Sequence, residues 1–199
     1  MSIKRRLTSA ESRSAALEAA RGLLIEAGPQ AVTLKAVANR IGRTHANLLH
    51  HFGTAAALQR ELAAFIAETV CASIADELEA SRAGLGSPRN VVDLTFDAFD
   101  RQGGGALVGW MLLTGNEEAI VPIAQTIHAM VDRVFPMESD HQGEGRMHRI
   151  SFTLMLMGLG DALIGERLSE ILNVERDAAR QLATNLVDVA LQEVSAEEG

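Results

Sequence analysis

Hydrophobic residues recur every three or four positions through most of this chain, which is the spacing of α-helices with one buried face. The first such segment is AESRSAALEAARGLLIEAG, whose apolar stripe consists of Ala16, Ala20, Leu23, Leu24 and Ala27. Thr8-x-x-Glu11 before it has the form of a capping box, and Gly28-Pro29 is a typical helix end. The pattern predicts an amphipathic helix near the N-terminus.

Two short helices and a long one are expected next. Thr33 is placed to cap the segment LKAVANRI, which Gly42 ends as a left-handed terminator. Thr44 is placed in the same way to cap HANLLHHF. A fourth helix is expected to begin at Gly53-Thr54 and to run to about residue 82.

The pattern predicts helices in the rest of the chain as well. GLGSPRN is the clearest linker, with Ser87 as a helix cap and Pro88 as the first helical residue. PMESDHQGEG is expected to be a loop and SAEEG a tail, and no strand or repeat is visible, so the fold class is all-α. The expected helices span about residues 88–101, 105–114, 117–135, 146–172 and 175–194.

The composition is that of a globular protein, with 47% hydrophobic and 22% charged residues in 199. One cysteine, Cys71, excludes an internal disulfide and lies in an apolar run, so we expect a buried side chain. The N-terminus has no secretory signal, and the longest apolar run, residues 150–165, is too short to span a bilayer. We therefore expect a soluble, cytoplasmic protein without a membrane segment.

Charge divides the chain into two unequal parts. The formal net charge is −8, yet residues 1–55 carry eight Lys and Arg against three Glu. A basic N-terminal part on an acidic body is typical of a head that binds a polyanion.

The basic part contains the features of a helix-turn-helix unit, whose second helix enters the DNA major groove. This geometry needs a small residue where the helices touch, a glycine in the turn and apolar anchors on both inner faces. Ala38 and Gly42 supply the first two, and the anchors are Val37, Ile41 and Leu48.

Residues 15–58, AALEAARGLLIEAGPQAVTLKAVANRIGRTHANLLHHFGTAAAL, resemble the N-terminal DNA-binding domain of TetR-type transcriptional regulators. The matching features are the apolar helix that ends in Glu-x-Gly, the Thr before the second helix, the Ala and Gly of the turn, and the His-Phe pair. The resemblance implies a helix-turn-helix domain at 1–54 and a ligand-binding and dimerisation domain at 55–199. It also implies a homodimer that represses transcription and leaves its operator when a small molecule binds.

Three positions depart from the family pattern. Arg43 stands where an aliphatic residue usually packs the turn, Leu49 replaces a common tyrosine, and Ala55 replaces a common lysine. The last two changes remove phosphate contacts, and the guanidinium of Arg43 can replace one of them or bind a guanine edge.

The positions of polar and basic residues around the two short helices predict specific contacts to double-stranded DNA. Thr33, Lys35 and Thr44 lie at helix N-termini, where hydroxyl, amide and ammonium groups bind phosphates. The recognition helix would present Asn47 to adenine and Ala46 to a thymine methyl, with His50 toward a phosphate. The predicted DNA-binding residues are Thr33, Lys35, Arg43, Thr44, His45, Ala46, Asn47 and His50, with a basic arm of Lys4, Arg5 and Arg6.

Catalytic and metal motifs are not apparent in the sequence. His45, His50 and His51 lack the spacing of a helical metal pair, and RQGGGALVG lacks the lysine of a phosphate loop. Asp93, Asp97 and Asp100 share one helical stripe, which we interpret as a solvated acidic face. We therefore expect neither an enzyme nor a bound cofactor or metal.

The C-terminal part has large apolar side chains that suit either a filled core or a pocket for an apolar effector. The predicted ligand contacts are Phe96, Phe99, Trp110, His128, Phe152 and Met155. Small residues in the penultimate helix and an apolar stripe on the last one predict the dimer contact. Its predicted residues are Gly158, Ala162, Gly165, Leu182, Leu186 and Val189.

Together these features favour a ligand-responsive repressor that binds a palindromic operator as a homodimer. Two alternatives remain from the sequence. One is a helical module whose basic N-terminus binds an acidic protein, and the other is a small-molecule-binding protein with a vestigial head.

Overall fold

The computed structural model describes residues 9–82, 85–136 and 145–197, and all regular elements among them are helices. The N-terminal helices are α1 (Ser9–Ala27), the 3-10 turn η1 (Pro29–Ala31), α2 (Leu34–Arg40), α3 (His45–Phe52) and α4 (Ala55–Arg82). They are followed by α5 (Pro88–Phe99), α6 (Gly104–Leu113), the 3-10 turn η2 (Glu117–Ala119) and α7 (Ile120–Val134). The last elements are α8 (Arg146–Gly160), the π-turn η4 (Asp161–Gly165), α9 (Glu166–Leu172) and α10 (Ala178–Glu197). The all-α prediction is confirmed.

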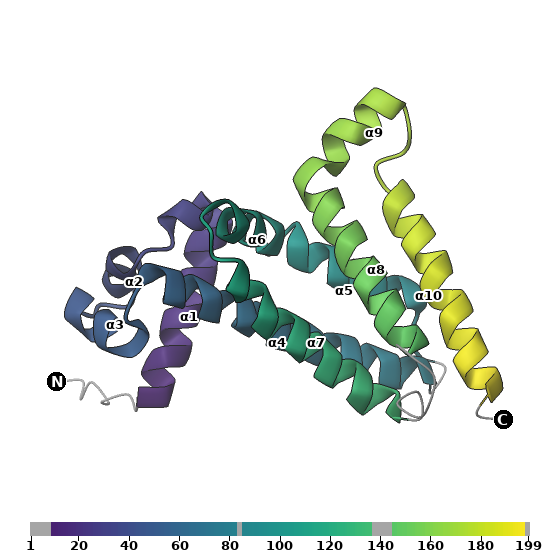
Figure 1. Ribbon diagram of the computed structural model, residues 1–199, viewed down its shortest axis with the longest axis horizontal. Helices are drawn as coiled ribbons and strands as arrows, with labels where there is room; N and C mark the ends of the chain where they lie inside the picture. Colours follow the sequence, from purple (N-terminus) through teal and green to yellow (C-terminus); the bar gives the residue numbers. More distant parts are fainter. Residues whose placement is uncertain (1–8, 83–84, 137–144, 198–199) are drawn as a thin grey trace.

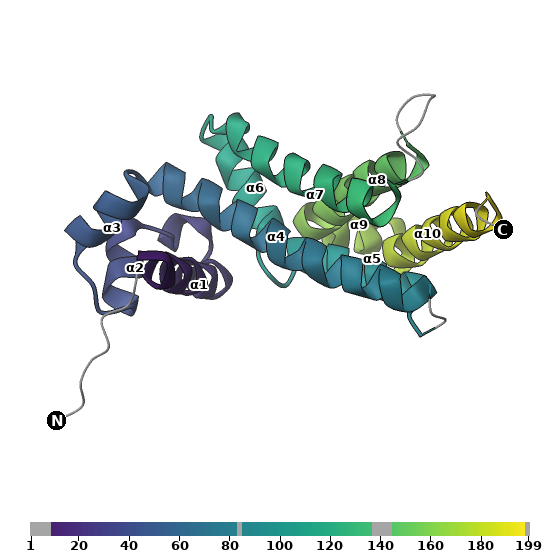
Figure 2. The same cartoon turned by 90° about the horizontal axis from the view of Figure 1, so that it is seen from below.

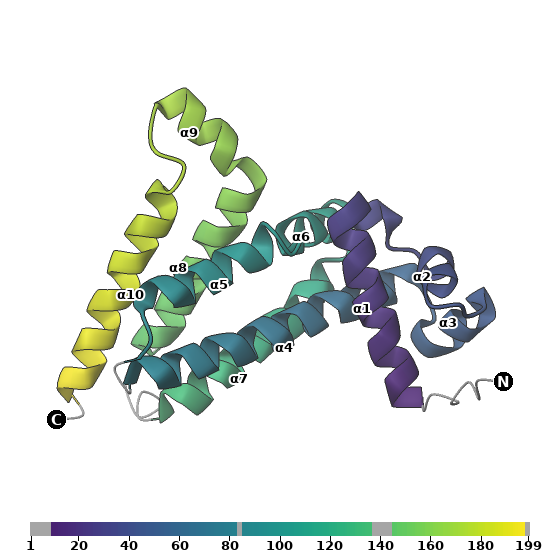
Figure 3. The same cartoon turned by 180° about the vertical axis from the view of Figure 1, so that it is seen from behind.

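The helices form an elongated molecule with a head at one end (Figure 1). Helices α1, α2 and α3 make the head, and α4 runs from it along the body beside α7 (Figures 1 and 2). At the other end α8 and α10 lie side by side, with α9 at the tip of their connection (Figure 3). None of the described helices is long and apolar enough to cross a lipid bilayer.

The predicted helix caps are confirmed where the structure describes them. The hydroxyl of Thr33 accepts a hydrogen bond from the Ala36 amide at 3.1 Å, and that of Thr44 accepts from the Asn47 amide at 3.2 Å. Ser87 caps α5 in the same way. The predicted cap at Thr8, the basic arm and most of the loop PMESDHQGEG lie outside the described residues.

The two C-terminal helices differ in detail from the prediction. The expected helix at 146–172 is continuous, but it contains the π-turn η4. There the buried Asp161 accepts a hydrogen bond from Arg176, which ties this turn to the segment before α10. The last helix begins at Ala178 and extends to Glu197, so SAEEG is not simply a tail.

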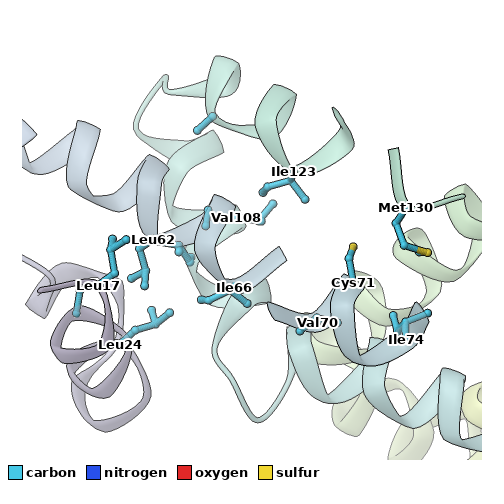
Figure 4. Close-up of a cluster of buried hydrophobic side chains, with 14 of the residues drawn as sticks. Leu17, Leu24, Leu62, Ile66, Val70, Cys71, Ile74, Val108, Ile123 and Met130 are labelled. Atoms are coloured by element: carbon cyan, nitrogen blue, oxygen red, sulfur yellow. The ribbon is translucent and has the colours of Figure 1, made fainter. Parts of the chain in front are cut away.

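Buried apolar residues are continuous from the head into the body along α4 (Figure 4). Leu62 of α4 belongs to the same buried cluster as Leu17 and Leu24 of α1. Further along α4, Ile66 and Ile74 continue this cluster toward α7. The division predicted after residue 54 stays a prediction, and α4 contributes to the core on both sides of the head–body junction.

A polar contact and a close approach join α1 to the turn between α5 and α6. The Arg21 guanidinium donates a hydrogen bond to the Gln102 side chain at 3.0 Å. Next to it, Gly103 has φ +76° and a Cβ at this position would lie 2.9 Å from Leu24 Cγ. Glycine is therefore required here both for the backbone conformation and for the contact with the head.

The prediction of a solvated acidic face is wrong for Asp93 and Asp97, whereas Asp100, just after α5, is exposed as predicted. Arg180 of α10 donates to Asp93 and to Asp97, each at 2.7 Å, and its guanidinium lies 5.2 Å from the Phe96 ring centroid. Arg89 bonds both oxygens of Asp177 at 2.8 Å. The acidic stripe thus holds α10 against α5, which the spacing within α5 alone could not indicate.

These contacts also change the acidity of the carboxyl groups. The hydrogen bonds from Arg89 lower the pKa of Asp177 below its usual value. Burial alone would raise the pKa of Asp93, but hydrogen bonds from Arg89 and Arg180 outweigh it, and its pKa is also lowered. Because the folded-state pKa is lowered, the pairs stabilise the fold above about pH 4, and this contribution is lost as acid protonates the carboxylates.

Replacing Arg180 by alanine should lower the free energy of unfolding by about 2 kcal/mol, because two carboxylates lose a largely buried partner. Arg180 is 13% exposed, whereas Arg101, which also pairs with Asp97, is 75% exposed. The matched control Arg101→Ala should therefore cost less than about 0.5 kcal/mol. Urea unfolding followed by circular dichroism measures both changes, and equal effects would contradict the assigned role of Arg180.

Candidate DNA-binding surface and apolar cavity

The turn between α2 and α3 has the packing expected of a helix-turn-helix unit. Ala38 is 1% exposed, so the small side chain lies where the two helices meet, with Val37 and Leu48 buried beside it. Gly42 has φ +65°, and the Arg43 amide donates to the Ala38 carbonyl at 2.9 Å. These contacts set the direction in which α3 leaves the turn.

The opposite side of α3 is open to solvent. Arg43, His45 and Ala46 at its start are exposed, as is His50, and Asn47 is half-buried. Thr33 and Lys35 at the start of α2 are exposed as well. Seven of the eight predicted DNA-binding residues are therefore exposed on the head, and Asn47 is half-buried.

The basic side chains of the head differ in their partners. Arg40 forms an ion pair with Glu26, and Arg13 forms one with Glu61 while lying 5.4 Å from the Phe52 ring centroid. By contrast, Arg43 and Lys35 have no ion-pair partner among the residues that the structure describes. These two cations are available for an external anion.

The hydroxyl groups of the capping residues Thr33 and Thr44 can still donate a hydrogen bond. Each hydroxyl of Thr33 and Thr44 accepts a hydrogen bond from a helix amide, which leaves its own O–H able to donate. A phosphate oxygen at these helix starts is a suitable acceptor for such a donor.

Leu49 and Ala55, which depart from the TetR pattern, lie at the edge of this surface. Leu49 is 46% exposed on α3, and Ala55 is half-buried at the start of α4. Leu49 adds apolar surface to the exposed side of α3, and neither Leu49 nor Ala55 has a side chain that can bind a phosphate. Arg43 is therefore the principal cation next to the turn.

This arrangement defines a helix-turn-helix DNA-binding head, and comparison with known proteins finds a family with a similar domain. Residues 16–62 match the family model described as "Bacterial regulatory proteins, tetR family". Residues 16–62 are thus similar to the N-terminal DNA-binding domain of TetR-type transcriptional regulators.

Other comparisons add less. No curated protein matches the chain. Among 15 matching chains of solved structures is the TetR family transcriptional regulator PfmR from Thermus thermophilus. The identity is 18%, with 94% of this chain and 97% of that chain covered, and the TM-score is 0.36. The TetR-type likeness of the chain therefore depends on residues 16–62 alone.

The body contains an apolar cavity of about 110 Å³ between α4, α5, α6, α7 and α8. Its walls include Ile66, Val70 and Ile74 of α4, which Figure 4 shows along this helix together with Val108, Ile123 and Met130 from α6 and α7. The polar groups of the lining are the hydroxyls of Thr95 and Ser151 and the thiol of Cys71. The cavity therefore suits an apolar molecule with few hydrogen-bonding groups.

Of the six predicted ligand contacts, two line this cavity and four do not. Phe99 and Met155 line the cavity. Phe96 is fully buried in a second apolar cluster between α5, α8 and α10, and Trp110 lies outside the lining. His128 and Phe152 are exposed on the outside of the body, Phe152 by 63%, so neither reaches this cavity.

The sequence analysis missed the contribution of α4 to the lining. Its apolar side chains could be recognised as buried, but not as facing a space, because that depends on helices distant in the chain. Cys71 is one of them, and the expectation that it is buried is confirmed. Burial raises the pKa of its thiol to about 11, with a small opposite effect of Arg133, so the thiol stays neutral and is a poor nucleophile.

The small residues predicted at the dimer contact pack within the chain instead. A Cβ on Gly158 would lie 2.9 Å from Phe99 Cδ2, and one on Gly165 would meet the carboxylate of Asp161. The Cβ of Ala162 lies 3.0 Å from the Cβ position of Gly105. The size of Gly158 and Ala162 is thus explained by contacts with α5 and α6, and that of Gly165 by the side chain of Asp161 within η4.

The apolar stripe on α10 is placed differently. Leu182 is 65% exposed and Val189 is 53% exposed, while Leu186 is half-buried. Neighbouring α8 and α9 also carry exposed apolar side chains, which are Phe152, Leu156, Leu168, Ile171 and Leu172. Such an accumulation is unusual for a monomer surface and is typical of a protein–protein contact.

Proposed function

We propose that the protein is a homodimeric repressor that binds a palindromic operator and is released by a small, apolar effector. The observation that carries this proposal is the exposed start of α3, where Arg43 has no ion-pair partner in the described part of the chain, above a buried contact between α2 and α3. The tetR-family match over residues 16–62 supports the DNA-binding role.

In this proposal α3 lies in the major groove, with Arg43 and Asn47 toward base edges. His45 and Ala46 lie beside them, and His50 points to the backbone. Thr33, Lys35 and Thr44 hold phosphates at the starts of α2 and α3. Because few cations of the described head are available to DNA, each of them is important for affinity.

The continuity of α4 provides the coupling between effector and operator. One helix contributes Leu58 and Leu62 to the core of the head and Ile66 and Ile74 to the walls of the cavity. An effector that prefers a wider cavity would shift α4 and the turn between α5 and α6, and this turn would act on α1 through the Arg21–Gln102 contact. The effector acts only to the extent that its affinity differs between the two arrangements.

The dimer contact is proposed on α8, α9 and α10. The exposed apolar side chains of these helices would be covered by the same surface of a second copy, as two-fold symmetry requires. The two heads would then face successive half-sites of a palindrome.

The double substitution Arg43→Ala, Asn47→Ala should weaken binding to a duplex selected by the wild type from a random pool. We expect a loss of about tenfold or more, because each good base contact contributes about 1–3 kcal/mol. Fluorescence anisotropy over a series of salt concentrations measures the affinity, and Lys35→Ala should reduce the salt slope by about 1.

Arg101→Ala is the matched control, since Arg101 is a 75% exposed arginine between α5 and α6, outside the head and outside the proposed dimer contact. It should leave duplex affinity unchanged. If the double variant binds the duplex as tightly as the wild type, the assigned recognition surface is wrong, and the basic head would fit an acidic protein partner or a vestigial role.

Ala67→Phe should block the cavity and reduce the binding of an uncharged apolar dye such as Nile red. Ala67 belongs to the cavity lining, whereas Ala106 is exposed on α6, so Ala106→Phe is the matched control. We expect an affinity at least about tenfold lower for Ala67→Phe, since overpacking removes the space. Unchanged dye binding, measured by fluorescence titration, would mean that the cavity does not accept such molecules.

Leu182→Glu should raise the dissociation constant of the dimer by at least about tenfold, because a carboxylate would be buried in an apolar contact. The side chain is exposed in the single chain, so the fold itself should tolerate the change. Sedimentation velocity measures the dissociation, with Thr69→Glu on the exposed side of α4 as a control. A variant as dimeric as the wild type would show that α10 is not at the interface.

A further inference from the structure

Two histidines and an aspartate meet where α7 packs on α8. His128 and Asp132 are one turn apart on α7, and the distance from His128 Nε2 to Asp132 Oδ2 is 3.4 Å. His148, in the first turn of α8, has its Nε2 at 3.3 Å from Asp132 Oδ1. The two imidazole rings are 4.5 Å apart between centroids. Three side chains from two helices thus point toward one place.

We propose that His128, Asp132 and His148 bind a divalent transition-metal ion. One ligand atom from each residue can be chosen so that all lie within 4.8 Å of one another. Metal–ligand bonds of about 2.0–2.2 Å at a tetrahedral centre place ligand atoms about 3.3–3.6 Å apart, and each imidazole Nε2 lies at 3.3 or 3.4 Å from one of the two oxygens of Asp132. A small movement of the imidazoles toward each other completes the arrangement.

The donor set indicates which ions fit. Two imidazoles and one carboxylate suit Zn²⁺, Co²⁺, Ni²⁺ or Cu²⁺, whereas Mg²⁺ and Ca²⁺ prefer oxygen ligands. Three protein ligands also leave a coordination position for water or another molecule. The i, i+4 spacing of His128 and Asp132 puts both ligands on one face of α7, as in helical metal pairs.

The state of His148 is a second observation that favours a ligand at this place. Its Nε2 is buried and has no hydrogen-bond partner among the described residues, although it faces the carboxylate of Asp132. A buried polar nitrogen without a partner is unfavourable, and coordination to a metal ion would satisfy it.

The site is adjacent to the apolar cavity but distinct from it. Ile127 and Val131 of α7 and Met147 and Ser151 of α8 line the cavity from the same two helices. A metal ion would therefore link the two helices at the cavity wall and restrain their separation. This inference does not depend on the proposed repressor function, because metal binding requires neither DNA nor an effector.

The test is a titration of the 199-residue chain, stripped of metal with a chelator, with Zn²⁺ by calorimetry and with Co²⁺ by visible absorption. We expect one ion per chain. Asp132→Asn and His148→Ala should each weaken Zn²⁺ binding by at least about tenfold, since even residues that only support a ligand contribute about 10–100-fold. Zn²⁺ should raise the Tm of the wild type but not that of Asp132→Asn.

His51→Gln is the matched control, because His51 is a partly buried histidine on α3, outside the cluster. Its Zn²⁺ affinity should equal that of the wild type, and circular dichroism should show that all variants are folded. Absence of Zn²⁺ binding, or equal binding by wild type and Asp132→Asn, would overturn the proposal. A Tm lowered in Asp132→Asn with no response of the wild type to Zn²⁺ would show instead that the three side chains form a purely structural ion pair.

Discussion

The packing of α4 against both the head and the body is the constraint on which the rest of the structure depends. Leu58 and Leu62 bury their side chains among α1, α2 and α3, while Ile66, Val70 and Ile74 face the body. Because helix cores are close-packed, a shift of α4 at one end cannot be absorbed locally. A single 28-residue helix therefore connects the DNA-binding head to the cavity.

The arginines of the described chain have two different roles: most of those named here join helices to one another, and Arg43 remains available for an external anion. Arg89 and Arg180 fix α10 to α5, Arg21 joins the head to the body, and Arg40 pairs with Glu26 inside the head. Arg43 alone among these is exposed without such a partner in the described part of the chain. An overall acidic protein thus presents the positive charge of Arg43 on the outside of its head, while Arg21, Arg40, Arg89 and Arg180 are engaged in contacts within the fold.

Local features of the fold followed well from the sequence, and features that join distant segments did not. Thr33, Gly42 and Thr44 act through neighbours within four residues, so their roles were predictable from spacing. The opposite holds for Asp93 and for Gly158, since the partners of Asp93 include Arg180, 87 residues away, and Gly158 packs on Phe99. The full cavity lining and the His128–Asp132–His148 cluster were not predicted from the sequence, because each combines side chains from helices that are separate in the chain.

The sequence by itself determined the helical class, most helix limits, the turn between α2 and α3 and the family of the head. These depend on hydrophobic period, capping and backbone freedom, which act over one or two helical turns. Only the tertiary structure decided which apolar side chains enclose a cavity, which remain exposed on α10, and which charged groups meet. Those outcomes depend on the angles and distances at which separate helices pack, and no local pattern specifies them.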